Sequence, residues 1–156
     1  MILSTELTQE EASNFFLSDP KLVLLGLSDE EICELHKTNQ YELQPDIHYI
    51  TVRENDKILA LVKYEYFSSV TISYHMYVAS SEQDKSEMYA EMIPMLKNYI
   101  ANELDIHKLI IIVPSTCLHT QAFALKAGYK EEGRLKNSFV WRQQIVDLII
   151  YGGEDN

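Results

Sequence analysis

Hydrophobic and polar positions change their period several times along the chain, and each change predicts an element of secondary structure. Three central runs are rich in β-branched and aromatic residues, which favours antiparallel strands. They are "HYITVRE", "ILALVKYEYF" and "TISYHMYVA". Asn55-Asp56 lies between the first two and is a typical hairpin turn. The continuous apolar run "KLIIIVP" predicts a buried strand, and "SFVWRQQIVDLIIYGG" predicts one or two final strands.

Helical spacing appears in four other places. "TQEE" and "SDEE" both fit a capping box, so we expect short helices at about 9–18 and 29–38. From Ser86 onward the apolar residues recur at helical spacing, although Pro94 is expected to kink or end this helix. "LHTQAFALKAGY" predicts a helix that ends at Gly128 in a left-handed conformation. The apolar stripe of the long helix is Met88, Met92, Met95, Leu96 and Tyr99.

The order of these elements predicts the fold class. Two helices precede three antiparallel strands, a long helix, a buried strand, a short helix and a closing hairpin. The strand, helix and strand over 70–113 should form a right-handed parallel crossover. We therefore expect an α+β fold with a mixed, mostly antiparallel sheet and helices on both faces. Because the sequence has no repeat, low-complexity tract or Gly/Ser linker, it predicts a single domain over 1–156.

The amino-acid composition limits the classes of molecule that the protein is expected to bind. The chain has 156 residues, of which 46% are hydrophobic and 24% charged, as in a soluble globular protein. A net charge of −11 would repel nucleic acid, whereas it could attract an amine or a lysine-rich protein, or simply keep the protein soluble. We expect no membrane partner, because no apolar run approaches the ~20 residues of a spanning helix. The beginning lacks the basic and apolar regions of a signal peptide, and the two cysteines lack metal or redox spacing, so a cytoplasmic location is expected.

The C-terminal half resembles the GCN5-related N-acetyltransferase (GNAT) superfamily. "AFALKAGYKEEGRLKNSFVWRQQIVDLIIYG" is similar to that family's helix, Gly-aromatic pair, "EEGR", strand and final "D-L-x-x-Y-G". The resemblance covers 47–153, while 1–45 match only in being helical. Within the superfamily, "SYHMYV", Pro114 and the Ser138-Phe139 pair after "EEGR" are most similar to small bacteriophage-encoded GNAT-like proteins. That similarity implies the cytoplasm of a bacterium or of a phage-infected host.

The resemblance implies an N-acyltransferase that uses acetyl-CoA and acts on an amine, either a small molecule or a protein. In the family, a splayed strand offers a backbone amide to the thioester carbonyl. That position falls on Tyr77 and Val78. The cofactor-contacting Asn that often opens the short helix falls on Cys117, where Thr116 or Ser115 could replace one hydrogen bond.

The loop "SSEQDKSEMY" takes the place of the family's pyrophosphate loop, Gln/Arg-x-x-Gly-x-Gly/Ala. Glycine lets backbone N–H groups approach the phosphate oxygens at the start of a helix. Gln83 keeps the first position, but Ser86 replaces the first Gly and Met88 the Gly/Ala, so the loop is degenerate. Three acids surround it and only Lys85 opposes them. These acids would repel coenzyme A, unless they simply stabilise the helix N-terminus.

His75 is the best candidate for the general base, since an ordinary histidine pKa of ~6.5 suits proton transfer near neutrality. The alternative is a structural histidine of the sheet. Glu65 is a weaker candidate, and the family's Tyr acid falls on Ala124. We expect no metal site, because the histidines form no pair at i and i+4 of one helix.

Two functions follow from these residues. One is a CoA-dependent N-acyltransferase with an unusual loop. The other is a catalytically inactive GNAT-fold protein that serves a phage as an accessory, assembly or partner-binding module. The altered loop and Ala124 favour the second, whereas the activity of most of the superfamily favours the first.

Overall fold

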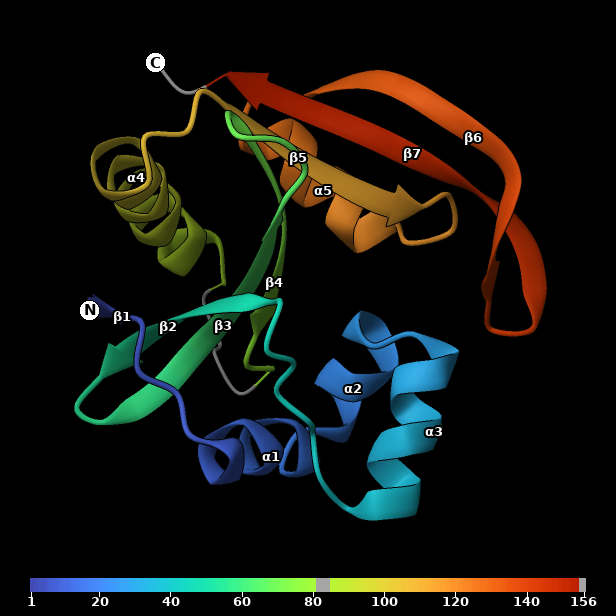
Figure 1. Cartoon of the computed structure of the whole chain (residues 1–156). Helices are drawn as coiled ribbons and strands as arrows, with labels where there is room; N and C mark the ends of the chain where they lie inside the picture. Colours follow the sequence, from blue (N-terminus) through green and yellow to red (C-terminus); the bar gives the residue numbers. More distant parts are fainter. Residues whose placement is uncertain (81–84, 155–156) are drawn as a thin grey trace. The chain divides into compact units, whose positions relative to one another are not determined.

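The computed structural model describes residues 1–80 and 85–154 and has five helices and seven strands in that part of the chain (Figure 1). The helices are α1 (Gln9–Leu17), α2 (Pro20–Gly26), α3 (Asp29–Thr38), α4 (Lys85–Glu103) and α5 (Leu118–Lys126). The strands are β1 (Ile2–Ser4), β2 (His48–Glu54), β3 (Lys57–Tyr66), β4 (Thr71–Val78), β5 (Lys108–Pro114), β6 (Lys130–Trp141) and β7 (Gln144–Glu154).

The strands form one mixed sheet in the order β1-β2-β3-β4-β5-β7-β6. β4 and β5 are parallel, and the long helix α4 connects them in the sequence. The pairs β1–β2, β2–β3, β5–β7 and β6–β7 are antiparallel. The predicted α+β class and mostly antiparallel sheet are therefore confirmed.

Two compact units divide the chain. The first comprises Met1–Tyr64 and His75–Met92, and the second comprises Glu65–Tyr74 and Ile93–Asn156. Strands β3 and β4 and helix α4 each run from one unit into the other. The single domain that the sequence predicts stays a prediction, and the two units are described separately below.

In the first unit, helices cover both faces of β4. Tyr77 and Ala79 belong to a hydrophobic core with α1, α2 and α3. Val78 lies between them in the sequence and packs instead with Met88 and Met92 of α4. Because successive side chains of a strand point to opposite faces, this alternation assigns α1–α3 to one face and α4 to the other.

The capping boxes begin their helices as predicted. The side chains of Thr8 and Ser28 accept hydrogen bonds from the third helical amides of α1 and α3, and the Glu at each of those positions bonds back. α2 was not predicted, because its apolar run was not recognised as helical. Its signal is Asp19-Pro20, since Asp is a good N-cap and proline fits the first helical position.

Two hairpin turns have the same backbone geometry but different sequence signals. Asn55 and Asp56 have φ of 52° and 65°, which confirms the predicted turn. Arg142 and Gln143 have φ of 51° and 65° between β6 and β7. Neither residue is a typical left-handed turn residue, so the sequence did not decide between one and two final strands.

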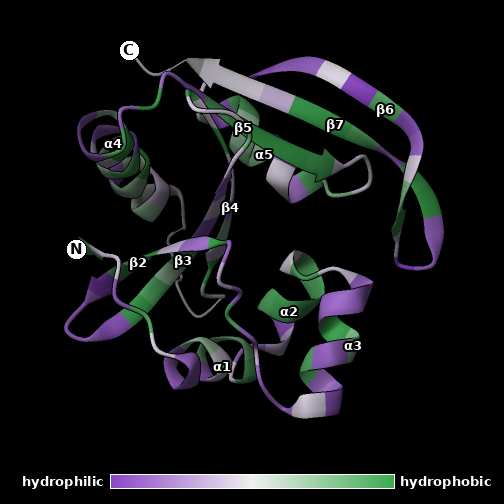
Figure 2. Ribbon diagram, viewed as in Figure 1, coloured by the Kyte–Doolittle hydropathy of each residue, from purple (hydrophilic) through white to green (hydrophobic). Residues whose placement is uncertain are grey.

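In the second unit, β5 is the apolar strand that the sequence predicts, and Figure 2 shows most of it as hydrophobic. It pairs with β7 from Leu148 to Glu154. The remainder of β7, with its partner residues on β6, extends beyond this pairing as a curved ribbon (Figure 1). The predicted left-handed residue after α5 is confirmed, since Gly128 has φ of 88°.

Helix α4 does not end at Pro94 but continues through it to Glu103. Proline lacks a backbone N–H, so one hydrogen bond is absent within the helix at this position. Pro94 lies next to the boundary between the two units, which falls between Met92 and Ile93.

We predict that Leu61→Ala lowers the free energy of unfolding by about 2–5 kcal/mol, because Leu61 is only 1% exposed in the core beneath α1–α3. Leu24→Ala is the matched control, since Leu24 is 61% exposed, and should change the free energy by less than about 0.5 kcal/mol. Urea denaturation measures both. Equal losses in the two variants would contradict this position of the core.

Candidate active site

The end of β4 presents a backbone amide on the edge away from β3. Ala79 donates its N–H to the carbonyl of Leu59 on β3, at 2.9 Å. N–H groups alternate between the two edges of a strand, so the amide of Val78 points to the opposite edge. The pairing of β4 with β5 covers Thr71–Ser73. Tyr77 and Val78 were both expected to offer a backbone amide. The N–H of Val78 therefore points away from β3, which is the suitable direction, whereas the N–H of Tyr77 points toward β3.

His75 lies on the face of β4 that α1–α3 cover, together with Tyr77. The two rings are 4.4 Å apart between centroids and tilted by 51°. Burial, and then the positive charge of Lys63, lower the pKa of His75 to about 4, against a smaller opposing effect of Glu31. The ring is therefore neutral at pH 7. It can still accept a proton, but it is a weaker base than an ordinary histidine.

The two charged groups that face His75 form an ion pair. Lys63 Nζ lies 3.3 Å from Glu31 Oε2 and 5.8 Å from the centroid of the Tyr77 ring. The other oxygen of Glu31 accepts the backbone N–H of Ser28 at 3.1 Å and so completes the capping box of α3. α3 thus places a carboxylate near β3 and β4, a pairing that the sequence alone did not indicate.

A group of tyrosines adjoins this ion pair. The Tyr41 hydroxyl hydrogen-bonds to the hydroxyls of Tyr49 and Tyr77. Phe16 of α1 packs against Tyr41 and Tyr77, with ring centroids 4.3 Å and 5.0 Å away. Burial raises the pKa of Tyr41 and of Tyr77, so both hydroxyls stay protonated at neutral pH. The side chain of Tyr77 therefore serves the core.

The remaining residues expected to contact the cofactor are only partly described. Gln83 lies outside the described residues. Ser86 belongs to the first turn of α4, where the structure describes its backbone. Cys117 precedes α5 in the second unit, apart in the sequence from His75, Tyr77 and Val78 of the first unit.

Cys117 occupies the N-cap position of α5, but its side chain makes no capping hydrogen bond. Burial raises the pKa of its thiol, which a smaller effect of Arg142 opposes, so the thiol is protonated at neutral pH. Ser115 was an expected substitute for the family's Asn. Its hydroxyl instead accepts the backbone N–H of Asp147 at 3.2 Å.

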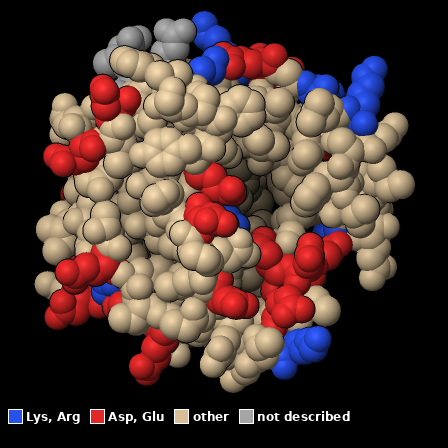
Figure 3. Space-filling view, viewed as in Figure 1, with Lys and Arg blue, Asp and Glu red and all other residues tan. Residues whose placement is uncertain are grey.

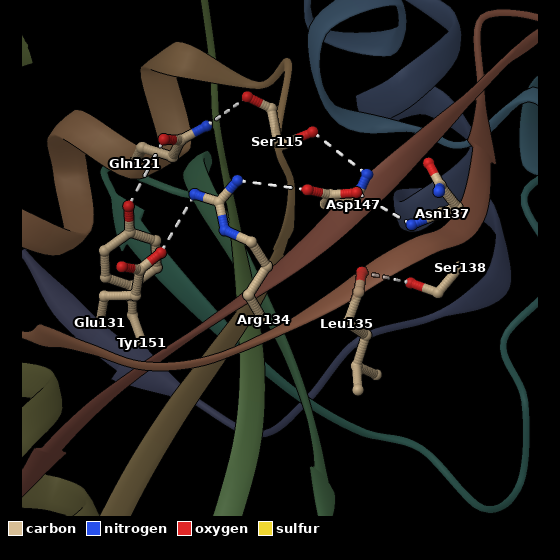
Figure 4. Close-up of polar contacts among 9 residues, drawn as sticks. All are labelled: Ser115, Gln121, Glu131, Arg134, Leu135, Asn137, Ser138, Asp147 and Tyr151. Atoms are coloured by element: carbon tan, nitrogen blue, oxygen red, sulfur yellow. Dashed lines mark hydrogen bonds and ion pairs between the residues drawn. The ribbon is translucent and has the colours of Figure 1, made fainter.

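The "EEGR" and "D-L-x-x-Y-G" motifs form a polar network in the second unit (Figure 4). Arg134 lies 3.2 Å from Glu131 and 3.3 Å from Asp147. Asp147 also accepts the backbone N–H of Asn137 at 2.9 Å, within the register shift between Leu135 and Phe139. The pKa of Asp147 is lowered, first by this amide and then by Arg134. These motif residues hold the irregular part of β6 against β7.

The same network reaches α5. Gln121 donates to the carbonyl of Ser115 at 2.9 Å and accepts the hydroxyl of Tyr151 at 3.4 Å (Figure 4). Ser115 donates its own N–H to the carbonyl of Asp147 at 2.8 Å. The motifs that carry the family resemblance therefore connect the beginning of α5 to β7.

Ala124, at the position of the family's Tyr acid, is completely buried in α5. Nearby in the sequence, Tyr129 forms a buried hydroxyl pair with Tyr74, at 2.7 Å between the oxygens. Burial raises the pKa of Tyr74. Sequence reasoning missed this pair, because nothing local connects a residue of β4 with one that follows α5.

Acidic residues outnumber lysine and arginine in the segment that contains α1–α3. Between residues 9 and 38 the sequence has seven Asp or Glu and two Lys. Figure 3 shows acidic side chains in red over the part of this face that these helices form. Among the described residues, no group of three His, Cys, Asp or Glu could hold a metal ion. Within 1–80 and 85–154, no helix has both the length and the apolar character to cross a membrane.

Comparison with solved structures supports the fold. A protein from Streptococcus mutans has 18% identity and a TM-score of 0.70, with 100% of both chains covered. A spermidine N-acetyltransferase from Vibrio cholerae, in complex with CoA and spermine, has 15% identity and a TM-score of 0.71, covering 99% of this chain and 95% of that chain. A ribosomal-protein-S5-alanine acetyltransferase from Vibrio fischeri has 15% identity and a TM-score of 0.71, covering 99% and 92%.

A comparison with curated protein sequences found no match. The family model of the acetyltransferase (GNAT) domain matches residues 30–150, which is most of the chain. The matched region includes nearly all of α3, β2–β5 and the "EEGR" motif of β6, and it ends within the "D-L-x-x-Y-G" motif of β7. This chain therefore belongs to the GNAT acetyltransferase domain family.

Proposed function

We propose that this protein transfers the acetyl group of acetyl-CoA to an amine. The observation that carries the proposal is the amide of Val78, which points away from β3 at the end of β4. A fixed N–H donor of this kind stabilises the negative charge that develops on a carbonyl oxygen during acyl transfer. Acetyl-CoA supplies the thioester carbonyl that the amine attacks, with the CoA thiolate as the leaving group.

His75 is the group that we assign to proton transfer. Its lowered pKa keeps the ring neutral at pH 7, so it has a free acceptor position for the proton that the attacking amine loses. Its basicity is modest, because burial and Lys63 both disfavour the charged form. The alternative, a purely structural histidine, predicts a variant with unchanged turnover.

Charge favours a cationic acceptor. The segment 9–38, which contains α1–α3, has seven acidic residues and two lysines, and the whole chain has a net charge of −11. Such a surface raises the local concentration of polyamines and of lysine-rich proteins. Binding of spermine by the Vibrio cholerae neighbour is consistent with this class of acceptor.

The position of Met88 removes one objection to cofactor binding. Met88 replaces a small residue of the family's loop pattern, but its side chain is 6% exposed and packs with Val52 and Val78 in the core beneath α4. Its bulk therefore contributes to the core of this unit. We assign cofactor contacts to Gln83, the backbone at Ser86 and the start of α5 at Cys117.

The similarity of this sequence to small bacteriophage-encoded GNAT-like proteins stays a prediction.

Acetyl-CoA binding is the first test. With a dissociation constant of about 10 µM and 1 mM ligand, binding raises the free energy of unfolding by about 2.7 kcal/mol, which thermal denaturation detects as a shift of several degrees. ATP is the control, because it has a similar negative charge and no acyl or pantetheine group. An equal shift with ATP indicates anion binding only. No shift and no calorimetric heat with acetyl-CoA would favour the inactive, partner-binding alternative.

Replacing His75 should change the pH dependence of stability. Its folded pKa of about 4 lies below the ordinary value of 6.5, so the unfolded chain gains a proton first as the pH falls. Between pH 6.5 and 4 this residue should lower the free energy of unfolding by up to about 1.4 kcal/mol per pH unit, and below pH 4 its contribution should no longer change.

We expect His75→Gln to remove this component in urea denaturation at several pH values. His36→Gln is the control, since His36 is exposed on α3. A wild-type slope that the His75 variant retains in full would show that the ring is not held in its neutral form.

A further inference from the structure

One carboxylate, that of Asp19, holds two elements at once. Its Oδ1 accepts the backbone N–H of Leu22 at 3.1 Å, which caps the beginning of α2. Its Oδ2 accepts the backbone N–H of Ser80 at 2.8 Å, and the Ser80 hydroxyl donates to Oδ1. Bonds to a charged acceptor are stronger than neutral ones. The N-cap of α2 is thereby fixed to Ser80, the second residue after the end of β4.

These bonds act on the part of β4 that the proposed function needs. Val78 is the last residue of the strand, and its neighbour Ala79 is held by the carbonyl of Leu59 on β3. Ser80 is the next residue and is held by Asp19. The chain after Val78 is therefore fixed at two successive residues, so the amide of Val78 has little freedom to change direction.

Packing alone does not hold this contact in place. Asp19 and Ser80 line an open cavity of about 560 Å³, together with Ser18, Pro20 and Ala79. Water can enter such a cavity and compete for the groups that line it. The hydrogen bonds of the carboxylate are thus what keeps Ser80 against the N-terminus of α2.

We propose that Asp19 is a positioning residue for acyl transfer, which orients the Val78 amide through Ser80. The inference rests on the proposed function, because it assigns a role within that reaction. A competing effect has the opposite sign, since a carboxylate near a polyanionic cofactor would repel it. Replacement of Asp19 should lower activity if positioning dominates, and raise affinity for acetyl-CoA if repulsion dominates.

The test uses Asp19→Ser, because serine is also a good N-cap but is too short and too poor an acceptor to replace all three bonds. Thr8→Ala is the matched control. It removes the side-chain N-cap of α1, which accepts the backbone N–H of Glu11, and so should lower stability without releasing Ser80 from Asp19. Both purified variants are compared with the wild-type chain for acetyl transfer to spermine and for amide hydrogen exchange.

For Asp19→Ser we expect kcat/KM for acetyl-CoA to fall about tenfold or more, with exchange of the Ser80 amide faster by roughly 10- to 100-fold. Thr8→Ala should lower the melting temperature and leave both quantities near wild type. Equal kcat/KM in Asp19→Ser and wild type, or tighter binding of acetyl-CoA, overturns the inference. A wild-type chain that neither binds nor turns over acetyl-CoA overturns the proposed function, and the exchange rates then still decide whether Asp19 holds the end of β4.

Discussion

Strand β4 is the constraint on which the first unit depends, because it is held on both faces and along one edge. Tyr77 and Ala79 are committed to the core with α1–α3, and Val78 to the core with α4. The bond from Ala79 to Leu59 fixes its edge toward β3. With the side chains of Tyr77 and Val78 buried in this way, the end of the strand offers a ligand its backbone rather than these two side chains. That arrangement suits a reaction in which the donor is an amide rather than a side chain.

The N-terminal helices do more than cover the sheet, because charged groups connect them to its strands. Glu11 of α1 lies 2.7 Å from Arg53 of β2, and Glu31 of α3 lies 3.3 Å from Lys63 of β3. The hydrogen bond from Arg53, and then that from the backbone of Thr8, lower the pKa of Glu11 to about 2. The acidic character of these helices is thus partly compensated where they meet the sheet.

Elements with a local signal could be predicted from the sequence. The capping boxes at Thr8 and Ser28, the turn at Asn55-Asp56 and the end of α5 at Gly128 are where the sequence places them. Each depends on a few neighbouring residues. The environment of His75 depends instead on Lys63 and Glu31, which come from other elements, so its lowered pKa had no local signal. The contact between Asp19 and Ser80 was missed for the same reason, since 60 intervening residues separate the partners.

Pro94 makes α4 easier to bend at one point than along the rest of its length. The helix continues through Pro94, but one backbone hydrogen bond of the helix is absent there. A helix bends at a lower cost in free energy where a backbone hydrogen bond is absent. This compliant point lies beside the boundary at Met92 and Ile93, where the helix leaves one compact unit and enters the other. The point at which α4 bends most easily therefore lies beside the boundary between the two compact units.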